Sequence, residues 1–505
     1  MTTVRDLMST PALVCGTDVS LADAAQQMRD AESGSIIVVE DRKAIGILTE
    51  RDLLRAAAAR LGPVSERVGL WMTANPDTLG PEEEAGAAWA SLSHHHYRHL
   101  PVVEAGELVG VVSIRDLFAI ASLRPADEVA HQVPRGLEGV VVSETTVGDV
   151  RGLEGFYNYR QYSAIELAEK RSLEDVWFLL FTGSLPTSSQ ASEFREETTA
   201  HRALPPGLHS MLPSLAGPGS PLDVLRTGVS LLGAELGWQA TTDLDGETLR
   251  RQAIQLCAVV PTLLAAAYRI RSGLEPLTPR HDLASAANYL WMLTGDEPAA
   301  ERARALEQYL MLTIDHGFNS STFTARVITS TGADLGAAVC GAIGALSGPL
   351  HGGAPSRALD MLDQIGTPDR ADGWIRDAIG RGERIMGFGH RVYKTDDPRS
   401  LFLRAVAREI DAPLVDFACH VERIVVDVLA ELKPDQRLYA NVEFFAGVVM
   451  NACGIPRQMF TPTFASSRVI GWAAQVMEQA GDNRLIRPTA RYVGPPPPQP
   501  VPLPA

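Results

Sequence analysis

The first 123 residues of the chain contain an internal repeat. Residues 46–53 (GILTERDL) recur as residues 110–117 (GVVSIRDL), and the same offset of 64 relates further positions without a gap. A constant offset indicates two copies of one supersecondary unit. Each copy reads helix, strand, strand, helix. A capping-box start at residues 20–23 precedes an apolar-periodic helix, and two β-branched runs, 36–39 and 45–48, flank a turn of Asp and Arg.

This repeat resembles a tandem pair of CBS domains, at about residues 1–62 and 65–123. In that family a Thr/Ser-x-x-Asp segment at a strand end holds a ribose or a phosphate. The resemblance implies a regulatory site for AMP, ATP or S-adenosylmethionine at Thr49, Asp52, Ser113 and Asp116. A carboxylate accepts from ribose hydroxyls, and a hydroxyl beside helix N-terminal amides can meet a phosphate. The alternative is that the two carboxylates only cap helices and that the pair mediates contacts.

The whole chain is too long for one ordinary core. Its 505 residues predict two or more domains, and 45% hydrophobic residues with modest charge indicate a globular protein. Residues 124–136 are rich in charge, contain two prolines and read as a linker. The Pro-rich tail at 493–505 is expected to be extended and poorly packed.

Charge and cysteine content restrict the function classes. A formal net charge of −16 argues against general nucleic-acid binding and against anionic membrane surfaces. Five scattered cysteines and a start without an apolar h-region predict a reduced, cytoplasmic protein. The apolar tracts 258–267 and 335–350 are too short to be convincing membrane spans, and the second predicts a tightly packed core helix. Three adjacent histidines at 94–96 cannot all face one ion, so no metal site is expected.

The segment 387–399 carries the strongest chemical signal. It places His390, Lys394 and Arg399 in one short loop after two glycines. Glycines let the backbone approach a ligand, histidine exchanges a proton near neutral pH, and an arginine fork suits a carboxylate. The loop therefore predicts a site for an anionic substrate with proton transfer at a carbonyl. Five further segments accompany it, at 155–160, 223–227, 315–323, 348–354 and 441–447.

Together these ordered segments closely resemble the citrate synthase family over residues 137–492. The resemblance implies an acyltransferase whose small domain is inserted at about 352–450 and whose active site lies in the cleft between two domains. Helical signals agree, because Ser172 and Asp175 can cap an apolar helix that Gly183 ends, and residues 469–477 follow helical spacing before Gly481. The expected fold class is therefore multidomain: an α/β tandem CBS module followed by an all-α, two-domain citrate synthase fold.

The resemblance also implies a role for each site residue. Glu443 would take a methyl proton from acetyl-CoA, His351 would donate to the thioester oxygen, and His390 would polarise the ketone of oxaloacetate. The dicarboxylate would be held by His316, Arg399, Arg468 and Arg487. Arg487 would reach in from the neighbouring subunit, so a homodimer is expected. Coenzyme A would be approached by Gly387, Gly389 and Lys394, and acetyl-CoA would be a co-substrate with no permanently bound cofactor or metal.

One departure from the family pattern concerns the base. Most members have Asp where this chain has Glu443, and the extra methylene moves the carboxylate by about an ångström. The neighbouring Phe445 and Ala446 are also less polar than the usual Tyr and Ser. Three functions stay open: a citrate synthase regulated by adenosyl ligands, a 2-methylcitrate synthase using propionyl-CoA, and a sensor or scaffold protein with an impaired site. Retention of the site histidines and arginines argues against the third.

Overall fold

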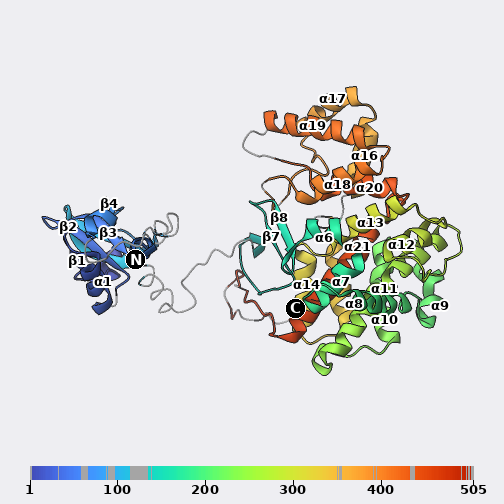
Figure 1. Ribbon diagram of the computed structural model, residues 1–505, viewed down its shortest axis with the longest axis horizontal. Helices are drawn as coiled ribbons and strands as arrows, with labels where there is room; N and C mark the ends of the chain where they lie inside the picture. Colours follow the sequence, from blue (N-terminus) through green and yellow to red (C-terminus); the bar gives the residue numbers. More distant parts are fainter. Residues whose placement is uncertain are drawn as a thin grey trace. The chain divides into compact units, whose positions relative to one another are not determined.

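The computed structural model comprises two compact units, residues 1–142 and 143–505, which we describe separately (Figure 1). It describes residues 3–31, 33–58, 66–86, 88, 92, 97–113, 116, 135–137, 139–349, 351, 355–390, 392–393, 395–432, 438–490, 492–495, 497–498 and 501. Lys394, the histidines at 94–96, most of the linker at 124–136 and part of the tail at 493–505 lie outside the described residues.

The first unit contains two copies of a short α/β motif. The first copy comprises β1 (Val14–Cys15), α1 (Leu21–Asp30), β2 (Ser35–Glu40), β3 (Lys43–Thr49) and α2 (Glu50–Ala58). The second includes α3 (Val68–Trp71), β4 (Thr73–Ala74), β5 (His99–Glu104) and β6 (Glu107–Ser113). Strands β1 to β4 form one sheet in chain order, with β1 parallel to β2 and the other pairs antiparallel. Strands β5 and β6 form an antiparallel hairpin.

The repeat seen in the sequence is reproduced strand by strand. Strands β5 and β6 begin and end 64 residues after β2 and β3. Even the irregularity of the ladder is repeated, because the register shifts between Val38 and Val39 in one hairpin and between Val102 and Val103 in the other. A bulge re-aims the strand that carries it, and here it stands at the same place in both copies.

Local sequence signals explain the elements of the first copy. Ser20 accepts a hydrogen bond from the N–H of Asp23 (3.1 Å) and caps α1, as the sequence predicts. The hairpin turn places Asp41 and Arg42 at φ 47° and 67°. Two successive left-handed residues are what a two-residue antiparallel hairpin requires, so the predicted strand–turn–strand is confirmed.

The second unit is mostly helical. A small antiparallel sheet comes first, with β7 (Gly148–Arg151), β8 (Phe156–Tyr159) and β9 (Tyr162–Ser163). The helices that follow are α6 (Ala164–Lys170), α7 (Leu173–Thr182), α8 (Ser188–Ala200), α9 (Pro206–Leu215), α10 (Pro221–Glu235), α11 (Gly246–Arg271), α12 (Ser285–Thr294), α13 (Ala300–Thr313), α14 (Ser320–Ser330), α15 (Leu335–Leu346), α16 (Pro355–Ile365), α17 (Ala371–Gly380), α18 (Pro398–Glu409), α19 (Val415–Leu432), α20 (Val442–Ala452) and α21 (Phe460–Gly481). The predicted fold class, an α/β module followed by an all-α synthase fold, is confirmed.

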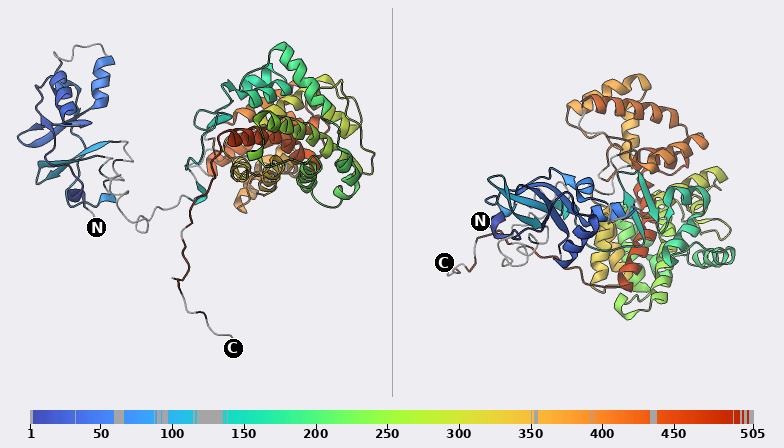
Figure 2. Two further views of the ribbon diagram at one scale, coloured as in Figure 1. Left: turned by 90° about the horizontal axis from the view of Figure 1, so that it is seen from below. Right: turned by 60° about the vertical axis from the view of Figure 1, so that its left-hand side comes forward.

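Helix α21, drawn in red, runs through the middle of this unit in both figures and packs against α11, α14 and α15 (Figures 1 and 2). Its Trp472 is fully buried. The predicted helix at Ser172 is confirmed, because Ser172 and Asp175 form a capping box and Gly183 ends α7 at φ 87°. These caps and the apolar faces between them give the unit a continuous core.

The helices of the proposed small domain lie together in the second unit. Figure 1 shows α16, α17, α18 and α19 in orange as a group, with α17 packed on α19 and both α16 and α18 packed on α20. The limits 352–450 stay a prediction, because residues 143–505 form one compact unit.

Helix α11 is longer than the apolar tract 258–267 from which it was predicted. Its 26 residues are enough, by length and composition alone, to cross a membrane. However, 78% of its apolar window is buried inside the structure. Burial of this kind is typical of the core helix of a globular protein, and α11 packs against the central helix α21.

Candidate active site

The start of α18 fixes the arginine of the segment 387–399. The carboxylate of Asp397 accepts hydrogen bonds from N, Nε and Nη2 of Arg399 at 3.0, 3.0 and 2.8 Å. It also accepts from the N–H of Val442 at the start of α20 (3.0 Å). Both members of the pair are buried, with exposures of 3% and 1%. Because a bidentate charged pair is geometrically specific, the guanidinium is held firmly where α18 meets α20.

His390 lies beside this guanidinium. Its Nδ1 accepts from the N–H groups of Val392 (3.0 Å) and Tyr393 (3.1 Å). In the neutral ring the proton is therefore on Nε2, which is 3.3 Å from Nη2 of Arg399. Because a guanidinium only donates, this contact is a hydrogen bond only in the other tautomer; with the proton on Nε2 both nitrogens are donors, and one oxygen of a ligand can accept from both. This arrangement is suited to a ketone with a carboxylate next to it.

His316 joins the same cluster from the loop between α13 and α14. Its Nε2 is 3.0 Å from Oη of Tyr393, and its ring centre is 5.5 Å from that of His390. Burial, together with the nearby Arg399 and His390, lowers the pKa of His316 well below its ordinary value. The ring is therefore neutral at pH 7 and takes part in hydrogen bonds without adding charge.

Arg468 brings a second buried cation from α21. It is 3% exposed, and its Nε donates to the carbonyl of Thr313 (2.8 Å), directly before the loop of His316. Its guanidinium lies 4.6 Å from the ring centre of Phe464. Burial raises the pKa of the adjacent Asp315 to about 6, although Arg468 opposes that shift. A buried cation needs a counter-charge, and a ligand carboxylate can supply one.

His351 is held by two residues of the large helical body. Its Nε2 is 2.8 Å from Oγ of Ser321, at the start of α14, and that oxygen also accepts from Nε1 of Trp472 (3.2 Å). Burial, with Arg468 as a second cause, lowers the pKa of His351 to about 4. This histidine is neutral over the physiological range, so it can polarise a carbonyl by donating a hydrogen bond without becoming an imidazolium.

Glu443 occupies the first turn of α20. Asn441 caps this helix, because its Oδ1 accepts from the N–H of Glu443 (3.0 Å). Burial raises the pKa of Glu443 to about 7, and the cation of Arg399 only partly offsets that effect. A carboxylate that titrates near neutral pH is both a better proton acceptor than an ordinary one and available in its ionised form.

The glycines of the segment 387–399 bring its backbone close to α20. Gly387 and Gly389 both have left-handed backbone angles, with φ 82° and 83°. The carbonyl of Gly387 accepts from the N–H of Asn441 (2.8 Å), and a side chain at Gly387 would place its Cβ 3.0 Å from Cβ of Phe444. Only glycine allows both the positive φ and this close approach. Packing of the loop against α20 therefore explains why glycine stands at this position.

The structure therefore groups most of the predicted synthase residues. His390 contacts both His316 and Arg399, and three further residues interact with this group electrostatically or through shared partners: Arg468, His351 and Glu443. Arg487 is different, because it is exposed and has no hydrogen bond or ion pair with this group within the part of the chain that the structure describes. Lys394 lies outside the described residues.

Several supporting residues were missed from the sequence. Tyr393 and Asp397 lie inside the predicted segment, and Asn441 directly precedes the helix of Glu443, so a closer search for helix caps would have found Asp397 and Asn441. Ser321 has no such signal, because it meets Trp472 from 151 positions away.

The four predicted regulatory residues are divided between two places. A cavity of about 410 Å³ in the first unit is lined by the first pair, Thr49 and Asp52, but not by Ser113 and Asp116 as far as the described residues extend. Residues of both copies contribute to its wall: Gly34, Ile47, Thr49, Glu50, Arg51, Asp52, Arg55, Thr73, Asn75, Pro76, Asp77, Tyr97, Arg98, His99 and Leu100. Its size and its arginines fit a small anionic ligand.

The two aspartates make the same local bonds. Asp52 accepts from N–H and Oγ1 of Thr49 at 3.0 and 2.7 Å, and Asp116 accepts from N–H and Oγ of Ser113 at 2.7 Å in both cases. These bonds agree with the capping alternative for both residues. They do not exclude a ligand, because a carboxylate has four lone-pair positions.

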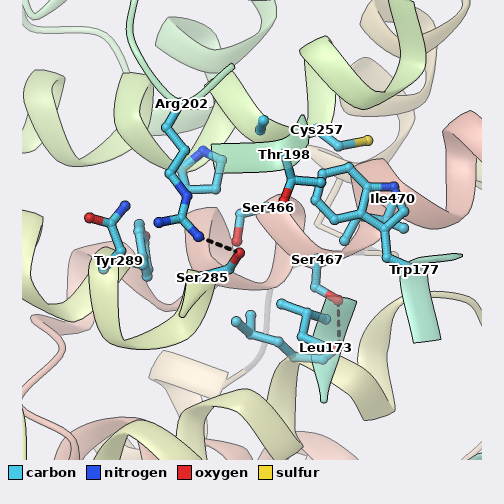
Figure 3. Close-up of a pocket in the computed structure, with 14 residues that line it drawn as sticks. Leu173, Trp177, Thr198, Arg202, Cys257, Ser285, Tyr289, Ser466, Ser467 and Ile470 are labelled. Atoms are coloured by element: carbon cyan, nitrogen blue, oxygen red, sulfur yellow. Dashed lines mark hydrogen bonds between the residues drawn. The ribbon is translucent and has the colours of Figure 1, made fainter. Parts of the chain in front are cut away.

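A second cavity lies inside the helical unit, away from the cluster just described (Figure 3). It measures about 30 Å³, and none of the predicted site residues lines it. Figure 3 shows Arg202 reaching across it to Oγ of Ser285, at 3.2 Å. A volume of this size suits water rather than a substrate.

Comparisons with known proteins agree with this geometry. Residues 136–489 match the family model "Citrate synthase, C-terminal domain", and residues 4–59 and 64–122 match the CBS domain. The citrate synthase of Deinococcus radiodurans is 40% identical over 72% of this chain and 96% of its own length. The 2-methylcitrate synthase of Mycobacterium tuberculosis is 38% identical over 76% and 96%. A crystal structure of citrate synthase from Thermotoga maritima superposes with a TM-score of 0.65 at 38% identity, over 73% of this chain and 98% of that one.

Proposed function

Because the chain belongs to the citrate synthase family and is an acyltransferase of that type, we propose that it condenses acetyl-CoA with oxaloacetate. A carbon–carbon bond forms between the acetyl methyl carbon and the ketone carbon. The methyl proton passes to a base and the ketone oxygen receives a proton, and water then cleaves the thioester to release citrate and CoA. The observation that carries the proposal is the cluster in which His390 contacts both His316 and Arg399.

The proposed roles follow from the protonation states. Glu443, with a pKa of about 7, takes the methyl proton. His351 is neutral and lies with Nε2 against Oγ of Ser321, and its donation to the thioester oxygen, where enolate charge develops, requires the tautomer with the proton on Nδ1. His390 donates from Nε2 to the ketone oxygen and becomes the acid that protonates it.

The dicarboxylate is proposed to lie against the cationic side of the cluster. Arg399 and Arg468 are buried and rigidly held, and His316 adds a neutral partner. Arg487 is proposed to complete the set from the neighbouring subunit of a homodimer. Its exposure in a single chain supports this proposal, because an exposed arginine is free to enter another subunit's site. The loop of Gly387 and Gly389 is proposed to receive coenzyme A.

A 2-methylcitrate synthase is the second candidate, since a relative with that activity matches this chain nearly as well as the citrate synthases do. One methylene in an apolar pocket discriminates by only about 10–200-fold. Both activities are therefore compatible with the residues around Glu443, where Phe445 and Ala446 are fully or almost fully buried and apolar.

Regulation by an adenosyl ligand is proposed for the CBS pair. The cavity of about 410 Å³ presents Arg51, Arg55 and Arg98 beside the hydroxyl of Thr49. Guanidinium groups and a hydroxyl at the start of a helix suit a phosphate. The carboxylates of Asp52 and Asp77 in the same wall suit ribose or adenine donors.

Thiol release separates these functions. Full-length protein is mixed with acetyl-CoA or propionyl-CoA, each with and without oxaloacetate. Release that requires oxaloacetate and is faster with acetyl-CoA is the expected result. Faster release with propionyl-CoA would assign the 2-methylcitrate reaction, and absence of release from every mixture would favour the sensor or scaffold alternative.

A further inference from the structure

A charge network that is exposed at one end and buried at the other connects the start of the second unit with the loop of His316. The connecting segment, residues 144–146, lies where the chain enters the synthase unit. Glu478 of α21 accepts from N–H and Oγ1 of Thr146 at 2.6 and 2.8 Å. The other carboxylate oxygen of Glu478 accepts from Nη1 of Arg326 (2.7 Å), and Nη2 of Arg326 donates to the carbonyl of Glu144 (3.3 Å). The segment is thus tied to α14 as well as to α21.

Arg326 is almost wholly engaged by this network. It is 3% exposed and lies in α14. Its Nε donates to Gln479 and its Nη1 to Gln475, both at 2.9 Å, in addition to the bonds to Glu478 and Glu144. The guanidinium also lies 5.7 Å from the ring centre of Phe318, two residues after His316. A guanidinium with this many fixed partners cannot shift without disturbing all of them.

The network ends at the residue next to His316. Gln475 accepts from Arg326 at Oε1 and donates from Nε2 to Oδ1 of Asp315 (3.3 Å). The guanidinium has only donors, so the amide must present its NH₂ to Asp315. The other oxygen of Asp315 accepts from the N–H of Gly317 (3.1 Å) and shapes the backbone on the far side of His316. Asp315 is 1% exposed, so these bonds decide its position.

We propose that Arg326 is a positioning residue for the dicarboxylate-binding histidine, and that the connecting segment 144–146 sets its position through Glu478. The chain of contacts runs from Thr146 to Glu478, Arg326, Gln475 and Asp315, and so to the loop of His316. The connecting segment follows directly after the first unit in the sequence. It therefore lies at the covalent connection between that unit and the synthase unit. The inference rests on the proposed role of His316 in holding oxaloacetate.

Three substitutions cut the network at different points. Gln475→Met removes the bond to Asp315 while keeping a side chain of similar length. Glu478→Gln leaves one acceptor oxygen where two are needed, so either Thr146 or Arg326 loses its partner. Arg326→Met removes the guanidinium at the centre of the network. Arg326→Lys keeps the positive charge but lacks the forked set of N–H donors. The matched control is Arg202→Met, because Arg202 is equally buried, at 4%, and bonds only to residues away from this loop.

The measurements are KM for each substrate, kcat, thermal unfolding and amide hydrogen exchange of residues 311–319 in the substrate-free full chain. We expect Gln475→Met, Glu478→Gln and Arg326→Met to raise KM for oxaloacetate by roughly 3- to 30-fold, the range typical of coupling networks. KM for acetyl-CoA should change little, exchange of residues 311–319 should quicken, and Arg326→Lys should recover part of the loss. Arg202→Met should lower the melting temperature and leave KM unchanged.

An unchanged KM and unchanged exchange in Gln475→Met would overturn the positioning role. A change in Gln475→Met without one in Glu478→Gln would remove the connecting segment from the proposal. If the protein has no activity with oxaloacetate, the proposed function fails. The exchange measurement still decides whether the network holds the loop of His316.

Discussion

The side-chain amide of Asn441 donates to the carbonyl of Gly389 at 3.0 Å. Its carbonyl oxygen at the same time caps the helix of Glu443. One side chain therefore sets both the proposed base and the backbone next to His390. Since a misplacement of about 1 Å can cost on the order of a hundredfold in rate, this residue should matter to catalysis although it need not touch substrate.

Asn441→Ala is expected to lower kcat by roughly tenfold or more and to destabilise the protein by about 1 kcal/mol, the usual cost of a lost N-cap. Steady-state kinetics and thermal unfolding measure the two effects. Thr187→Ala is the matched control, because Thr187 caps α8 with a capping box at the surface. It should cost similar stability and no activity. Equal kcat in the two variants would mean that Asn441 serves only as a cap.

The shared-site hypothesis depends on Arg487. Arg487→Ala should weaken oxaloacetate binding strongly, because one partner of a charge-assisted pair is lost. Mixing this variant with His390→Ala should restore part of the activity, since a hybrid dimer has one site that keeps both residues. Subunit exchange is verified by mass spectrometry of tagged chains. Verified exchange with no recovery would place Arg487 in its own subunit's site or outside any site.

As far as the structure describes the first unit, one of the two predicted regulatory pairs lines the cavity and the other does not, so the second pair serves as an internal control for the first. The repeat supplies equivalent positions, and among the described residues Thr49 and Asp52 belong to the cavity wall in the first unit whereas Ser113 and Asp116 do not. Thr49→Val with Asp52→Asn should abolish binding of AMP, ATP or S-adenosylmethionine in calorimetry. Ser113→Ala with Asp116→Asn should leave it within a few-fold. Equal losses would show that the ligand occupies another place, and no heat with wild type would leave the pair a structural module.

Sequence reasoning was most successful where short-range signals decide the structure. The cap at Ser172, the stop at Gly183 and both hairpins of the repeat depend on neighbouring residues. The site was predicted as a set of residue types, but its supports were not. Ser321 holds His351 from α14, which packs on α21, and the cavity in the first unit is lined by the Thr–Asp pair of the first copy and by other residues of the second. Tertiary packing, which no local pattern encodes, makes these choices.

The base gives a pH prediction. Glu443 must be ionised to accept a proton, so kcat should rise with pH through about 7 and then level off. His351 has a pKa of about 4 and that of His316 is also lowered, so neither should add a step between about pH 5 and 9. A flat profile between pH 5 and 9 would contradict the assignment of Glu443 as the base.

Substitution of Glu443 tests the same group through rate and stability. Glu443→Gln should lower turnover by roughly 10²–10⁴, as expected for loss of a general base, with a smaller effect on oxaloacetate binding. The pKa of Glu443 is about 7 in the folded state, above the ordinary 4.5. Ionisation of this carboxyl group therefore lowers the free energy of unfolding as the pH rises from about 4.5 through 7. The Gln variant lacks this loss, and its melting temperature should exceed that of wild type at pH 8 but not at pH 5. Near-normal turnover in the variant would mean that another residue takes the proton.

Glu443→Asp asks whether the pocket has adapted to the longer side chain. Asn441 fixes the backbone of the first turn of α20. The carboxylate of an aspartate at position 443 would therefore lie about an ångström closer to the backbone than that of Glu443. In an adapted pocket the rate falls. In an unadapted pocket the more usual family geometry returns and the rate rises. We expect a fall, because the neighbouring Phe445 and Ala446 are buried and apolar and have no polar side-chain group to offer a retracted carboxylate. A rise in kcat at unchanged KM for oxaloacetate would show that the wild-type base is misplaced.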